Sequence, residues 1–125
     1  MKYMIMMFGE ASSMVATQTP EWIEQMMAFM FTIDDDLTAS GELVFQAGLA
    51  DGYTAKTLRL EHGAVVTTDG PFAESKESII GFWVVDVASE ARALEITASI
   101  VEVTGGPIEV RLSPDGPSGP AEPPE

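Results

Sequence analysis

Apolar residues recur between positions 19 and 41 with the period of an amphipathic α-helix. Thr19 offers an N-cap hydroxyl, Pro20 occupies the first helical position, and Gly41 can take the left-handed conformation that ends a helix. The three aspartates at 34–36 are expected on the solvated side, where successive positions diverge by about 100° and cannot converge on one metal ion. The expected core face consists of Trp22, Met26, Met30, Ile33 and Leu37.

Strand patterns occupy much of the remaining chain. Segments 1–8 and 79–85 are apolar at almost every position, which is typical of strands buried on both faces. Ser89 is expected to cap a second helix that runs to about Glu102. Shorter strands are predicted at 43–48, 57–61, 64–68 and 108–112.

The strands at 57–61 and 64–68 are predicted to form a hairpin around His62-Gly63, a dipeptide suited to a tight turn. Leu58 and Leu60 alternate with polar residues in the first of these strands. Such alternation predicts one solvated face opposite an apolar face.

The order of these elements predicts an α+β fold: a ferredoxin-like βαββαβ sandwich with an added β-hairpin. This fold places its first and third main strands in the centre of the sheet, and these are the two segments without alternation. Two helices can cover only one face of such a sheet, so the apolar second face needs another cover. A second copy of the sheet is the simplest cover, and we therefore expect a homodimer.

The chain has 125 residues, which on length is one domain. We assign this domain to 1–112 and interpret 113–125, rich in Pro, Gly and acidic residues, as a disordered tail. No apolar run approaches the ~18 residues that a membrane helix needs. The N-terminal apolar run stops after six residues without a cleavage site, so we interpret it as a strand of a cytoplasmic protein.

Charge and composition exclude several partners. The formal net charge of −14 repels nucleic acid and anionic lipid surfaces, so neither a nucleic acid nor a membrane is expected as a partner. A basic protein surface, or a small ligand in a locally positive pocket, stays open. With one His and no Cys, no metal site is predicted, and no cofactor is predicted either.

The stretch TDGPFAESKE, residues 68–77, has two interpretations. In the first it is a turn, in which Asp69 accepts backbone hydrogen bonds, Gly70 supplies a positive φ and Phe72 anchors the loop. In the second the stiff Gly-Pro corner holds a carboxylate in one orientation beside a pocket. Asp69 or Glu74 would then be an acid or base, and Lys76 would neutralise a carboxylate or bind an anionic group.

Four further residues are candidates for ligand binding. Tyr3 begins the first central strand, Gln46 is the polar residue of an otherwise apolar strand, and Phe72 and Ser75 belong to the motif. Trp83 is interpreted as a core residue in preference to a platform for a ligand. His62 is interpreted as a turn residue.

The segment DGPFAESKE (69–77), together with MKYM (1–4), GF (81–82) and EVR (109–111), strongly resembles the YCII-related family and its DGPF-domain branch. The resemblance covers essentially residues 1–113. It implies a dimeric α+β barrel, in which two ferredoxin-like sheets pack face to face. Many members of this branch are encoded beside, or fused to, sigma-factor-like transcription regulators, and the wider superfamily includes a dehydrochlorinase that acts on a chlorinated aromatic ring.

The chain departs from the family pattern at one point. The parent YCII proteins resemble one another in a His on or near the first helix, proposed to pair with an Asp, and this chain has no His there.

Three classes of function stay open. A small-molecule-binding or regulatory module, with a regulatory protein as a further partner, is favoured. The alternative is an acid/base enzyme that acts on a small molecule, aromatic ones included, through Asp69, Glu74 and Lys76. A purely structural partner protein is the third class.

Overall fold

The computed structural model describes residues 1–71 and 78–119. The elements follow the predicted order, with one short helix and one 3-10 turn in addition. They are β1 (Lys2–Phe8), α1 (Ala11–Thr17), α2 (Pro20–Ala39), β2 (Leu43–Gly48), η1 (Gly52–Thr54), β3 (Lys56–Glu61), β4 (Ala64–Asp69), β5 (Ile79–Asp86), α3 (Glu90–Thr104) and β6 (Ile108–Ser113).

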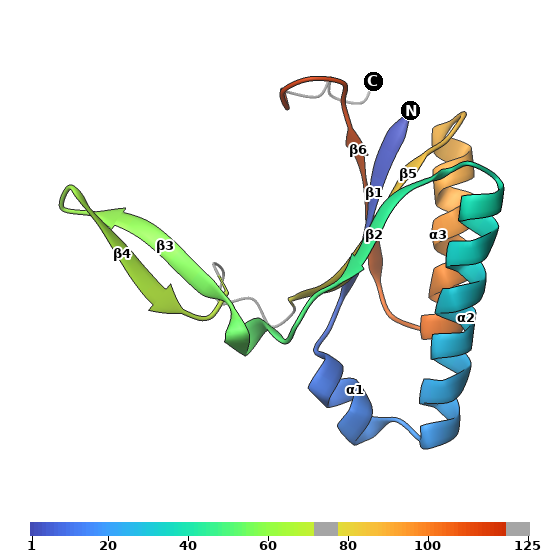
Figure 1. The fold of residues 1–125 in the computed structure, drawn as a ribbon, viewed down its shortest axis with the longest axis horizontal. Helices are drawn as coiled ribbons and strands as arrows, with labels where there is room; N and C mark the ends of the chain where they lie inside the picture. The colour runs from blue at the N-terminus through green and yellow to red at the C-terminus, as the bar shows by residue number, and fades with distance from the viewer. Residues whose placement is uncertain (72–77, 120–125) are drawn as a thin grey trace.

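Four strands form one antiparallel sheet in the order β2-β5-β1-β6, and β3 and β4 form a separate two-stranded sheet. Helices α2 and α3 lie together on one face of the larger sheet (Figure 1). This arrangement confirms the ferredoxin-like α+β fold. The two strands without alternation, β1 and β5, are the central pair, as predicted.

The two long helices begin as the sequence predicts. Thr19 Oγ1 accepts a hydrogen bond from the backbone N–H of Trp22 at 3.1 Å, with Pro20 at the start of α2. Ser89 Oγ accepts one from the N–H of Arg92 at 3.2 Å and caps α3 in the same way. Gly105 ends α3 with a φ of 74°, a conformation that favours Gly because it has no Cβ.

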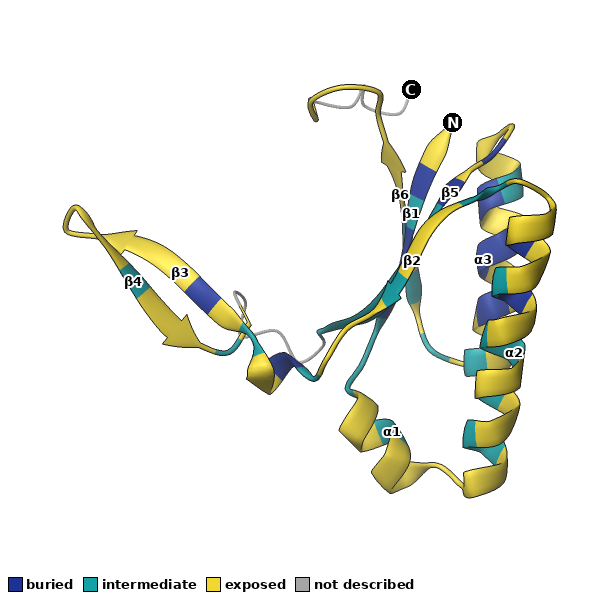
Figure 2. Cartoon of the chain, in the orientation of Figure 1, coloured by how far each residue is buried: buried dark blue, intermediate teal, exposed yellow. Residues whose placement is uncertain are grey.

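The core lies between the helices and one face of the sheet (Figure 2). Ile5 of β1 is paired with Trp83 of β5 and with Val110 of β6, so these side chains point to the same, helix-covered face. The buried cluster includes Tyr3, Ile5, Met7, Ile33, Leu37, Trp83, Val85, Ala93, Ile96 and Ile100. Tyr3, predicted to bind a ligand, belongs to this cluster and is only 4% exposed.

The opposite face of the sheet is apolar along β1, β5 and β2, whereas β6 contributes Glu109 and Arg111 to it, opposite Met6 and Met4. Met4 is paired with Val84, and Met6 with Phe82, which places these side chains on the face away from the helices. Phe45 of β2 joins them, with its ring centroid 5.9 Å from that of Phe82 and 57% of the residue exposed. No helix of residues 1–71 and 78–119 covers this surface, which we call the bare face.

The β3–β4 hairpin projects away from the sandwich (Figure 1). His62 and Gly63 both have positive φ, 50° and 79°, as a tight two-residue hairpin turn requires. The predicted alternation of burial does not form in β3, where Thr57 is buried and the other residues of both faces are exposed. Leu58 and Leu60 are 62% and 73% exposed while Thr57 on the other face is buried, because the apolar side of the hairpin meets no described part of the chain.

Helix α1 was not predicted from the sequence. It has seven residues, no side-chain cap, and no buried residue among those the structure describes, so neither periodicity nor capping marks it. Beyond β6, residues 114–119 form no helix or strand. Within the described ranges, no helix is both long and apolar enough to cross a membrane.

An ion pair ties the start of β2 to the first turn of α3. Arg92 donates from Nε and Nη2 to the two carboxylate oxygens of Glu42, both at 2.9 Å. These hydrogen bonds hold the pKa of Glu42 below its ordinary value. Arg92 also contacts Glu95, but that carboxylate is 72% exposed.

We expect Glu42→Gln to lower the free energy of unfolding by about 1 kcal/mol at neutral pH. A carboxyl whose pKa is lowered by folding stabilises the fold above its unfolded pKa, about 4.3, and this contribution is lost as the pH falls through the folded pKa. Urea unfolding at several pH values should therefore show the wild type and the variant converging in acid.

Glu95→Gln is the matched control, because it removes the exposed partner of the same Arg92. Its effect should stay within about 0.5 kcal/mol. An equal loss in the two variants, or a Glu42→Gln difference that persists in acid, would contradict the assignment.

Candidate functional site

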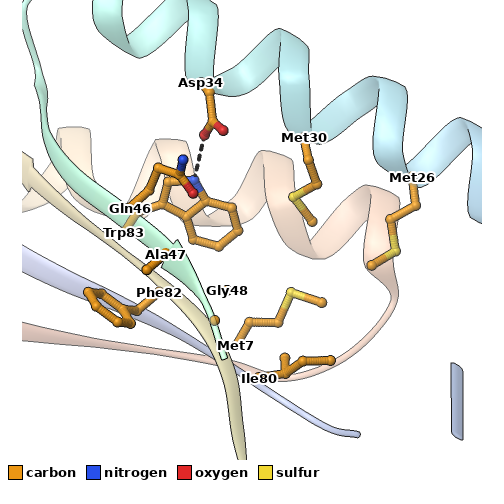
Figure 3. A pocket seen from close by; sticks show the side chains of 11 residues that line it. Met7, Met26, Met30, Asp34, Gln46, Ala47, Gly48, Ile80, Phe82 and Trp83 are labelled. Atoms are coloured by element: carbon orange, nitrogen blue, oxygen red, sulfur yellow. Dashed lines mark hydrogen bonds between the residues drawn. The ribbon is translucent and has the colours of Figure 1, made fainter. Parts of the chain in front are cut away.

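A cavity of about 220 Å³ lies between α2 and the β2 edge of the sheet (Figure 3). Met26, Met30 and Asp34 line it from α2. Gln46 from β2, and Trp83 and Ile80 from β5, are among the residues that line it from the sheet. An apolar cavity of about 150 Å³ can hold benzene, so this space suits a body of roughly one ring.

Asp34 joins the helix to the sheet inside this cavity. Its Oδ1 accepts a hydrogen bond from Trp83 Nε1 at 2.9 Å, and the residue is half-buried. The expectation that Asp34 lies on the solvated side of the helix is therefore wrong, although Asp35 and Asp36 are exposed as predicted. Positions 26, 30 and 34 are spaced by four and share one helical face, so the spacing alone places Asp34 beside the two Met residues. Treating the three aspartates as one group hid this signal.

Of the predicted ligand-binding residues that the structure describes, Tyr3 and Gln46, only Gln46 lines the cavity. It is paired with Trp83 across the β2–β5 ladder, so both side chains point to the helix-covered face. Within the described part of the chain, its amide forms no hydrogen bond to another residue. Gln46 is exposed, so its amide faces solvent and is free to bind a ligand, and its role stays a prediction.

The two ends of the cavity differ in polarity. Asp34, Gln46 and the indole of Trp83 lie together at one end, while the side chains of Met26 and Met7 lie towards the other (Figure 3). Met is flexible and polarisable, so this apolar end can adapt to ligands of different shape. No Lys, Arg or His is among the described residues that line the cavity.

The first residues of the 68–77 motif lie at the root of the hairpin. Lys56 Nζ donates to Asp69 Oδ1, and the Asp69 side chain is 83% exposed. The N–H of Gly70 donates to the carbonyl of Ala55 at 2.8 Å, and Thr57 Oγ1 donates to the carbonyl of Gly70 at 2.8 Å. These contacts fix where the motif leaves β4.

The other predicted residues of the motif, Phe72, Glu74, Ser75 and Lys76, lie outside the described residues. Asp69 itself is not among the residues that line the cavity. The structure thus brings Gln46 to the cavity and places Tyr3 in the core and Asp69 on the hairpin. Among the described residues, no group of three or more His, Cys, Asp or Glu is arranged to hold a metal ion.

Exposed ion pairs contribute roughly 0 to 1 kcal/mol, so we expect Asp69→Ala and Asp69→Asn to lower the free energy of unfolding by no more than about 1 kcal/mol. Lys56→Gln, which removes the other partner of the pair, should have the same effect. Chemical unfolding of the three variants measures this.

The same variants test the catalytic role predicted for Asp69. If Asp69→Asn keeps the wild-type stability and loses binding or turnover of a ligand that the wild type accepts, the carboxylate acts at a site. If both Asp69 variants bind and turn over as the wild type does, that role is wrong.

Two comparisons place the chain among known proteins. The model of the YCII-related domain matches residues 1–112. An uncharacterized protein of Rhizobium meliloti (strain 1021) is 30% identical over 113 residues, which cover 89% of this chain and 90% of that protein.

Proposed function

The chain belongs to the YCII-related family, and we propose that it is a cytoplasmic small-molecule-binding module that works as a homodimer. The observation that carries this proposal is the cavity beside α2, which combines an apolar body with polar groups at one end. Ligand sites typically have this composition: mostly apolar walls and a few polar groups that orient the ligand.

Binding is better supported than catalysis. The cavity lining holds one carboxylate, and among the described residues it presents no nucleophile paired with a base. The acid/base alternative depends on Asp69, Glu74 and Lys76. Of these, only Asp69 is described, and it is largely exposed and paired with Lys56.

The bare face supports the homodimer. Met6, on the central strand β1, is only 7% exposed within one chain. Phe45, on the edge strand β2, is 57% exposed. A second copy offers the same surface, so two bare faces meeting about a two-fold axis would bury Phe45 and Phe82 on each side. This packing is the dimeric α+β barrel that the family resemblance implies. The exposed apolar side of the hairpin, with Leu58 and Leu60, offers further surface to the same partner.

We place the protein in the DGPF-domain branch on its 69–77 motif, and infer a regulatory role from the transcription regulators that accompany members of that branch. A small protein that binds a ligand without converting it suits such a role. Its regulatory protein partner would bind the ligand-bound state of the homodimer selectively.

Blocking the cavity should abolish ligand binding. Met30→Trp places a large side chain in the cavity, whereas Phe31→Trp adds the same side chain at a position that is 66% exposed. Ligand-detected NMR with a library of single-ring compounds is the measurement. We expect hits for the wild type and Phe31→Trp that disappear in Met30→Trp. Hits that persist in a folded Met30→Trp variant would place the ligand elsewhere.

Light scattering at micromolar concentration should give about twice the 13.4 kDa chain mass. We expect Phe45→Glu to produce monomers, because it replaces an apolar ring of the bare face, on the edge strand β2, with a charge that the apposed face would bury without a partner. Phe31→Glu, an equal change on the outer side of α2, should leave the dimer intact. A monomeric wild type would refute the dimer, and dissociation by Phe31→Glu alone would move the interface to the helices.

A further inference from the structure

We propose that the ligand of the cavity is a small organic cation, a protonated amine carried on an apolar body of about one ring. This inference rests on the proposed function, since it names the class of molecule that the same cavity accepts. Two features support it: the charge of the lining and the free hydrogen-bond acceptors at the polar end.

The charge of the lining selects against anions. Among the described residues that line the cavity, Asp34 is the only charged one. No basic side chain in this lining could neutralise an anionic ligand. The chain as a whole carries 20 acidic and 6 basic residues, which raises the local concentration of cations and lowers that of anions. A carboxylate or phosphate ligand would enter this cavity without a counter-charge.

The acceptors at the polar end match an ammonium group. Trp83 Nε1 satisfies Oδ1 of Asp34 at 2.9 Å and orients the carboxylate. Within residues 1–71 and 78–119, Oδ2 of Asp34 and the amide oxygen of Gln46 have no protein donor. An ammonium group has three N–H donors and no acceptor, so it can bind Oδ2 of Asp34. A charge-assisted hydrogen bond of this kind is stronger than a neutral one.

The rest of the lining suits an apolar body. Trp83 is only 6% exposed and turns the N–H edge of its indole towards Asp34 (Figure 3), so its part is to orient the carboxylate. The apolar body of the ligand would then extend towards Met26, Met30 and Met7. An alcohol of the same shape would use the acceptors but gain no charge attraction.

Three probes of one shape test the inference on the wild-type protein: benzylamine, benzyl alcohol and benzoate. We expect benzylamine to bind more tightly than benzyl alcohol by about tenfold, and benzoate to show no binding. The benzylamine affinity should fall as salt is added, because salt screens the attraction to Asp34. The affinity for benzyl alcohol should not change. Calorimetry or ligand-detected NMR gives these constants.

Asp34→Asn tests the anchor. Asn keeps an amide oxygen that can accept the Trp83 hydrogen bond, so the fold should be retained, and a thermal melt verifies this. We expect benzylamine to fall to the affinity of benzyl alcohol in this variant. Asp35→Asn removes the same charge from the next helical position, which is exposed, and should leave the preference for the amine unchanged.

The outcomes separate the two proposals. If benzyl alcohol binds in the cavity as well as benzylamine does, the cationic class is wrong and the small-molecule site stands. If Asp35→Asn lowers the benzylamine affinity as much as Asp34→Asn, the attraction comes from the acidic surface and the anchor is wrong. If none of the three probes binds the wild type, the cationic class is overturned, and the library screen with Met30→Trp decides the proposed function separately.

Discussion

The two central strands, β1 and β5, are apolar on both faces, and the two long helices can cover only one of them. Burial of apolar surface is the main favourable term in folding, so this imbalance constrains the rest of the molecule. On the covered face, α2 and α3 pack against Ile5, Trp83 and Val85. On the other face, Phe45 and Phe82 stay partly in contact with solvent within one chain. The sandwich is therefore complete on one side and open on the other.

The cavity arises at the edge of this helix layer. Helix α2 faces Gln46 and Gly48 of the edge strand β2 with Met26 and Met30. Methionine side chains are long and flexible, so they fill this space less completely than branched side chains would. The indole N–H of Trp83, which is only 6% exposed, needs a hydrogen-bond acceptor once it leaves water. Asp34 supplies that acceptor, and in doing so it brings a charge to the rim of an apolar space.

Much of the fold follows from local signals in the sequence. The Thr19-Pro20 start of α2, the His62-Gly63 turn and the unbroken apolar runs of β1 and β5 each have a direct physical cause, and each element forms where predicted. Among its described residues, helix α1 has no fully buried one, only the partly buried Met14 against the core, and therefore leaves no clear periodic pattern. For the site, Gln46 is recognisable as a polar residue without a structural role. The contact of Asp34 with Trp83 joins positions 49 residues apart, and only the packing of α2 on the sheet reveals it.

Successive side chains of β5 point to opposite faces of the sheet, so neighbouring residues have different environments. Trp83 points into the helix-covered side and forms one wall of the cavity, while the adjacent Val84 points to the bare face. In the proposed homodimer, a ligand beside Trp83 and the second subunit against Val84 would press on opposite sides of the same strand. Binding equilibria that share an element are reciprocal: if the ligand strengthens association, association strengthens ligand binding by the same factor. The affinity for the ligand would then depend on protein concentration, and a single strand would be sufficient to couple the two events.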